Sequence, residues 1–159
     1  PPAAARAGVG MTGAKGATGA TAPEPRGETA TGPGRLVVAV YAVLAIAATF
    51  RSGVQILRDF DAAPLAYALS GVAAVVYVLA TVALAQGGRW RPVAWVAVGT
   101  ELVGVVVVGA LSLTRADLFP DATVWSGFGQ GYGYVPAVLP LVGLWWLWRT
   151  RPRGGGSAR

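Results

Sequence analysis

Residues 93–113, VAWVAVGTELVGVVVVGALSL, form an apolar run that decides the fold of this chain. An apolar helix needs about 20 residues to span the roughly 30 Å hydrocarbon core of a bilayer, so this run can cross a membrane. Its Val and Leu residues each favour insertion by roughly 0.3–0.6 kcal/mol, whereas one central acid costs about 2.5–3.5 kcal/mol. Insertion is therefore favourable, and the single acid, Glu101, is expected to face protein or water and not lipid.

The composition is that of a small integral membrane protein. Of 159 residues, 54% are hydrophobic and only 13% are charged, which lies outside the usual balance of a soluble domain. The chain has no Cys and no His, so it lacks thiol chemistry, the commonest general base and the commonest metal ligand. We therefore expect no enzyme activity, no cofactor and no metal site. The net charge of +6 comes from bases that flank apolar runs, which favours lipid headgroups over nucleic acid as partners.

The hydrophobic pattern predicts an all-α, polytopic membrane protein with four transmembrane helices in an up-down bundle within residues 35–151. The predicted spans are residues 36–57, 64–85, 92–113 and 134–149. Residues 1–34, rich in Ala, Gly, Pro and Thr, and the basic residues 152–159 are predicted to be disordered tails. Residues 1–34 also lack the apolar core of a cleavable signal peptide, so the first span is expected to serve as an uncleaved anchor.

The distribution of basic residues predicts the orientation. Ten of the 13 Lys and Arg residues lie on one side of a four-span arrangement, and only Arg51, Arg58 and Arg115 lie on the other. Because positive residues concentrate on the cytoplasmic side, both termini are expected in the cytoplasm of a multi-pass plasma membrane protein.

The fourth span is predicted to be short, at roughly 14–17 residues or about 21–26 Å. Either the preceding segment GFGQGYG, residues 127–133, dips into the outer leaflet under cover of protein, or the helix begins earlier and kinks at its prolines. We favour the dip. The GYG within this segment does not predict a potassium filter, because no Thr-Val lead-in precedes it.

Small and polar residues recur at helical spacing along the first three spans, which predicts their inward faces. These residues are Tyr41, Ala45, Ala48, Ser52 and Gln55 in the first span, Ser70, Ala74, Tyr77 and Thr81 in the second, and Ala97, Glu101, Gly104, Val108 and Leu111 in the third.

Glu101 is the main candidate for a functional group. We interpret it first as one half of a buried pair that fixes helix register, with Arg51 as the nominated partner and Tyr77, Ser70 or Gln55 as alternatives. A second interpretation is a proton or cation pathway, because intramembrane acids commonly mark such pathways. A third is pairing with a helix of a partner protein.

Four acids are expected in the outer loops: Asp59, Asp61, Asp117 and Asp121. They could gather around a divalent cation, but two loops would have to converge for that. We favour solvated loop acids.

The segments RSGVQ, APLAYALS, TEL, VWSGFGQGYGYVP and LPLVGLWWL resemble small four-span integral membrane proteins of high-GC actinobacteria. The resemblance covers about residues 35–151 and implies the same fold, but it transfers no functional residues because that group carries no assigned activity. Four-span multidrug exporters also carry one membrane acid, but theirs lies in the first helix, which argues against kinship.

We therefore predict a non-enzymatic accessory or scaffold subunit of the cell envelope. Its expected partners are the lipid bilayer and either another membrane protein or further copies of itself. The alternative is a small oligomeric transporter or channel with Glu101 on the pathway.

Overall fold

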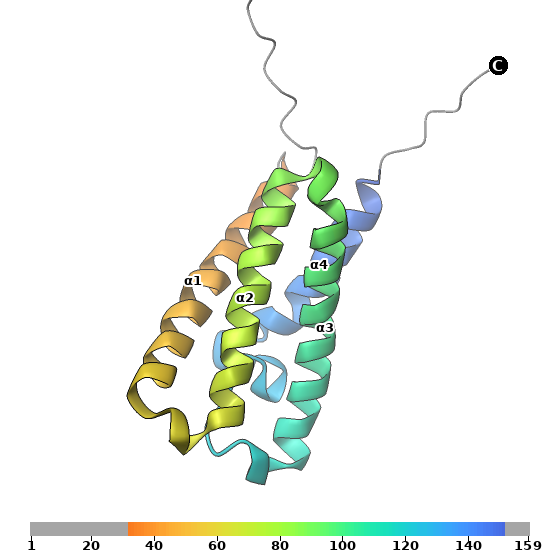
Figure 1. The fold of residues 1–159 in the computed structure, drawn as a ribbon. Coiled ribbons are helices and arrows are strands. Elements are labelled where there is room, and N and C mark those ends of the chain that lie inside the picture. The colour runs from red at the N-terminus through yellow and green to blue at the C-terminus, as the bar shows by residue number, and fades with distance from the viewer. Residues whose placement is uncertain (1–31, 152–159) are drawn as a thin grey trace, which may run out of the picture.

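A computed structural model describes residues 32–151, which form four α-helices joined by short 3-10 turns (Figure 1). The helices are α1 (Pro33–Asp59), α2 (Pro64–Gln86), α3 (Arg91–Thr114) and α4 (Val135–Arg149). The all-α prediction is confirmed for this part of the chain, and each helix ends within three residues of its predicted bounds. The predicted disordered tails lie outside the described residues, except that α1 begins at Pro33, inside the predicted first tail.

Three of the helices are long and apolar enough to cross a membrane. At 1.5 Å per residue, α1 with 27 residues, α2 with 23 and α3 with 24 extend about 40, 35 and 36 Å. Helix α4 has 15 residues and extends only about 22 Å. The predicted shortness of the last helix is therefore confirmed.

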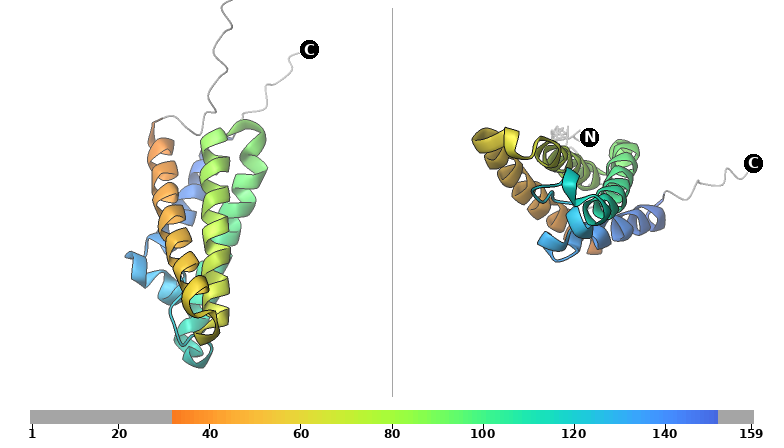
Figure 2. Two further views of the ribbon diagram at one scale, coloured as in Figure 1. Left: turned by 60° about the vertical axis from the view of Figure 1, so that its left-hand side comes forward. Right: turned by 90° about the horizontal axis from the view of Figure 1, so that it is seen from below.

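The chain runs up and down through the bundle (Figure 1). Helices α1 and α2 form a hairpin that turns through η2 (Phe60–Ala62). The α2–α3 connection, η3 (Gly88–Trp90), lies at the opposite end, together with the start of α1 and the end of α4. We call the end that holds η2 the loop end. Helix α4 packs mainly on α3 and is inclined to the other helices (Figure 2).

Alanine, tyrosine and some valine and leucine residues fill the interior, while many other large apolar residues face outward. The predicted inward residues Tyr41, Ala45, Ala48 and Ser52 are buried. In contrast, side chains on the outer surface remain exposed, including Phe50 at 73% and Val96 at 69%. A sheath of exposed apolar side chains around a core of small residues is the pattern expected of helices that pack within lipid.

Beyond α3 the chain passes through η4 (Ala116–Leu118) at the loop end and then folds back between the helices (Figure 1). We call residues 123–134, which include η5 (Ser126–Phe128) and η6 (Gln130–Tyr132), the docked segment. Its Trp125 side chain lies so close to Gly104 that a Cβ there would be 2.6 Å from the indole. Gly104 lies ten residues before the end of α3, so the docked segment reaches about 15 Å into the bundle.

Glycine allows the docked segment to turn back. Gly129 has a φ of 81°, and a Cβ on it would lie 2.7 Å from the ring of Pro136. Only glycine combines that left-handed backbone with such a close approach. Residues 127–133 therefore fold back against the helices, with Gln130, Gly131 and Gly133 still exposed, and α4 does not begin earlier than expected. The dip into the outer leaflet stays a prediction.

Candidate functional site

Glu101 lies at the centre of the bundle and is bound by Tyr41. The Tyr41 hydroxyl donates a hydrogen bond of 2.6 Å to Glu101 Oε2, and both residues are 0% exposed. Tyr41 and Glu101 lie at a similar height along the bundle because α1 and α3 run in the same direction (Figure 1). Tyr41 stands eight positions after the start of α1, and Glu101 stands ten positions after the start of α3. Glu101 faces protein, as expected.

Helix α4 closes this site from one side. A Cβ on Gly143 would lie 3.2 Å from the Tyr41 hydroxyl oxygen and 3.2 Å from a methyl carbon of Val98. The absence of a side chain at Gly143 therefore lets α4 pack directly over the Tyr41–Glu101 hydrogen bond.

Tyr77 and Trp125 extend the site toward the loop end. The Trp125 indole N–H donates a 3.0 Å hydrogen bond to the Tyr77 hydroxyl, and the rings of Tyr41 and Tyr77 are 6.3 Å apart between centroids. We call Tyr41, Tyr77, Glu101 and Trp125 the buried polar centre. Three helices and the docked segment each contribute one of its members, so the centre couples these elements to one another.

The chemistry available to the buried polar centre is limited by its enclosure. Glu101 Oε1 is buried and has no hydrogen-bond partner among the described residues, and the same is true of Ser70 Oγ. Among residues 32–151, no group of three or more His, Cys, Asp or Glu side chains is placed to hold a metal ion. What the centre can do is hold helices in register and, through Oε1, accept one further proton or hydrogen bond.

The prediction that Arg51 pairs with Glu101 was wrong. Arg51 donates a 3.1 Å hydrogen bond from Nη2 to the backbone carbonyl of Ala122 and does not pair with Glu101. Arg51 stands 18 residues into α1, whereas Glu101 stands ten residues into α3, so they differ by about 12 Å in height. The docked segment lies in the intervening space, and the carbonyl of Ala122, just before it, is a nearer acceptor.

The alternative partners also lie elsewhere. Gln55 donates to Asp121 Oδ2 at 3.2 Å near the loop end, and Tyr77 bonds to Trp125 rather than to Glu101. Ser70 is buried on α2 at 0% exposure. The structure thus brings only Tyr77 of the nominated residues into the buried polar centre with Glu101.

The four predicted loop acids are dispersed. Asp59 and Asp61 are exposed, and Asp121 caps the backbone N–H of Ala122 at 2.8 Å. Asp117 accepts hydrogen bonds from Arg115 at 3.0 and 3.1 Å. These bonds lower the pKa of the Asp117 carboxyl below its ordinary value. Nothing in this arrangement gathers the acids around one cation.

Sequence reasoning missed the roles of Tyr41 and Trp125. Tyr41 was placed on the inward face, and counting residues along two parallel helices could have paired it with Glu101. Trp125 was not assigned to the site from the sequence, but its side chain is 2% exposed and lies against Gly104. A glycine one turn from the buried acid was the available signal of a close neighbour.

Comparison with protein-family models, curated proteins and solved structures found no match for this chain.

Proposed function

We propose that this protein is a multi-pass protein of the plasma membrane that serves as a non-enzymatic accessory or scaffold subunit. The observation that carries the proposal is the enclosure of Glu101: the one acid in the middle of the apolar helices is engaged by Tyr41 of the same chain. A group used in this way specifies helix packing, which is the best-attested use of buried polar residues.

The membrane placement rests on the long apolar helices and on their exposed aliphatic side chains. We propose four crossings, in which α4 and the docked segment together complete the fourth. Both chain ends are assigned to the cytoplasm because ten of 13 bases fall on that side. The loop end then faces the cell exterior.

A partner helix has a suitable place to pack. A groove of about 440 Å³ between α1 and α2 is lined by the small residues Ser52, Gly53, Gly71 and Ala74 together with larger apolar side chains. Small residues let helix backbones approach closely in lipid, where association depends on packing and hydrogen bonds. This groove supports either a second membrane protein or another copy of the chain as the partner.

The proposed orientation predicts which sites an impermeant reagent can reach. The chain contains no Cys, so single variants Ala62→Cys, Ala116→Cys and Arg151→Cys have no background labelling. In intact cells, an impermeant maleimide is expected to label the first two, which are exposed at the loop end, and to label Arg151→Cys only after permeabilisation. Labelling of Arg151→Cys from outside, or protection of both loop-end sites, contradicts the orientation.

A transporter is the second candidate, and the unpartnered Oε1 of Glu101 favours it. The two candidates differ in the flux expected of the protein in liposomes loaded with a pH-sensitive dye. An accessory subunit is expected to give the same proton flux as empty liposomes, with or without Glu101→Gln. Flux above that baseline in the wild type, lost in Glu101→Gln, would establish the transporter and end the accessory proposal.

A further inference from the structure

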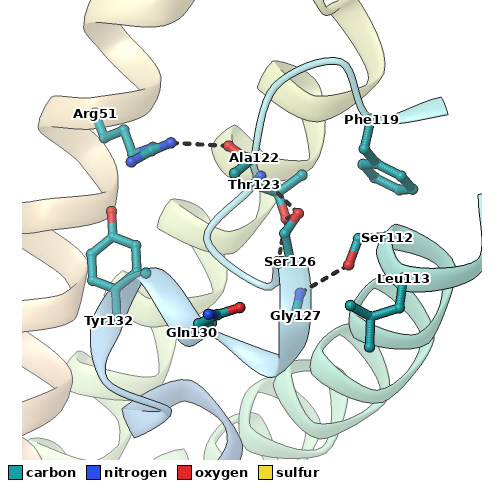
Figure 3. Close-up of a pocket in the computed structure, with 11 residues that line it drawn as sticks. Arg51, Ser112, Leu113, Phe119, Ala122, Thr123, Ser126, Gly127, Gln130 and Tyr132 are labelled. Atoms are coloured by element: carbon teal, nitrogen blue, oxygen red, sulfur yellow. Dashed lines mark hydrogen bonds between the residues drawn. The ribbon is translucent and has the colours of Figure 1, made fainter. Parts of the chain in front are cut away.

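A second polar region lies at the loop end, separate from the buried polar centre. It is a cavity of about 550 Å³ between α1, the end of α3 and the docked segment. Figure 3 shows Arg51 and Tyr132 on one side of it and Ser126, Gly127 and Ser112 on the other. Nothing in the accessory role requires this cavity.

Among the described residues that line the cavity, Arg51 is the only basic one. Among the described residues, the one ion pair within 4.0 Å joins Arg115 and Asp117, so Arg51 has no acidic partner at that distance. Its one hydrogen bond to a described residue uses Nη2, which leaves Nη1 free to donate; Nε also has no partner but is buried. A guanidinium with unused donors is suited to an oxyanion, because its planar fork matches carboxylate and phosphate oxygens.

Two neutral polar side chains beside Arg51 are also unused. Gln130 and Tyr132 line the cavity, and neither side chain forms a hydrogen bond with another described residue. In Figure 3 the Tyr132 hydroxyl points toward Arg51. Arg51, Gln130 and Tyr132 therefore offer one positive charge and further donors around a shared space.

The opposite side of the cavity is rigid. Ser112 accepts a 2.8 Å hydrogen bond from the backbone N–H of Gly127, and Ser126 accepts one of 2.9 Å from that of Thr123. These hydroxyls fix the docked segment to α3 and to itself. Phe119 and Leu113 add apolar surface to the wall, which suits a ligand that has an apolar part beside its charged group.

The charge of the wall limits the charge of the ligand. Asp121 lies near Arg51, where its carboxyl accepts from Gln55 and from the N–H of Ala122, and it adds negative charge beside the site. A single cation next to an acid favours a monoanion over a dianion. We propose that this cavity binds a small monoanionic oxyanion, a carboxylate or a phosphodiester, with Arg51 as its anchor. The group can belong to a soluble molecule or to a lipid headgroup.

Binding is measured by calorimetry on the full chain in dodecyl maltoside, with two probes. Benzoate is a soluble carboxylate with an apolar body, and dihexanoylphosphatidylglycerol carries a lipid phosphodiester. We expect Arg51→Gln to weaken binding by about 10- to 100-fold, because hydrogen bonds to charged groups are strong. Arg58→Gln is the matched control: it removes an exposed arginine from the same helix outside the cavity and is expected to bind like the wild type.

Two conservative variants keep the test decisive if Arg51→Gln does not fold. Arg51→Lys retains the charge but not the planar fork, and Tyr132→Phe removes one hydroxyl; each is expected to weaken binding by severalfold. Benzoate binding that depends on Arg51 identifies a soluble ligand, and binding of the lipid probe alone identifies a headgroup. If neither probe binds, or if Arg58→Gln weakens binding as much as the Arg51 variants do, the proposal is wrong. Because these measurements need no bilayer, a failure here leaves the proposed accessory role standing.

Discussion

Replacing Gly104 by leucine is expected to lower the free energy of unfolding by about 3 kcal/mol and to release the docked segment from the bundle. A Cβ at Gly104 would already lie 2.6–2.8 Å from three atoms of the Trp125 indole. That indole is 2% exposed and is held by Tyr77, so it cannot move aside without losing its packing and its hydrogen bond. The side chain of leucine therefore displaces Trp125.

Unfolding in a denaturing detergent measures the loss of stability, and hydrogen exchange of residues 123–134 measures the release. Gly99→Leu is the matched control because it lies on the same helix and a Cβ there meets nothing within 4 Å. Since glycine costs about 1 kcal/mol relative to good helix formers, Gly99→Leu is expected to leave stability unchanged or slightly raised. Equal losses in both variants, or unchanged exchange in Gly104→Leu, contradict the docking of Trp125 on α3.

The helices could be predicted from the sequence because each one is a mainly apolar run between turn residues. Helix α2 begins at Pro64 and ends before Gly87, which has a φ of 59°. Pro at a helix start and Gly just after a helix end are both signals that the sequence shows. The inward faces could also be predicted, because small and polar residues such as Ala48 and Ser52 repeat at helical spacing. Lipid and protein interior differ little in polarity, so small size is the informative property.

The partner of Glu101 could not be predicted with the same success. Opposite charge favoured Arg51 as the partner. That reasoning did not include the docked segment, which inserts Trp125 toward the centre, or Ala122 just before it, whose carbonyl accepts from Arg51. A connection of irregular backbone has no periodicity, so its path depends on the particular fit of Trp125 to Gly104 and of Phe128 to Gly109. Such fits become visible only once the helices are placed.

The Tyr41–Glu101 hydrogen bond is expected to stabilise the bundle. Tyr41→Phe leaves the buried carboxyl of Glu101 without its one hydrogen-bond partner, and we expect the free energy of unfolding to fall by about 2 kcal/mol. Glu101→Met is expected to cost a similar amount, because it leaves the Tyr41 hydroxyl buried and unpaired. Glu101→Gln retains an acceptor for that hydroxyl and is expected to cost less than either.

The double variant Tyr41→Phe with Glu101→Met decides whether the two residues act as a pair. Each single change strands one polar group in an interior closed by Gly143, whereas the double change leaves neither group, and replacing both partners by apolar groups of similar shape can be nearly neutral. Unfolding in mixed micelles is therefore expected to give a double variant about 1–2 kcal/mol more stable than the sum of the two losses predicts. Simple addition of the losses would mean that Glu101 contributes to stability without Tyr41. In that case the enclosure of Glu101 would no longer support a packing role. The unpartnered Oε1 of Glu101, which favours the transporter, would then be the more informative observation at this site.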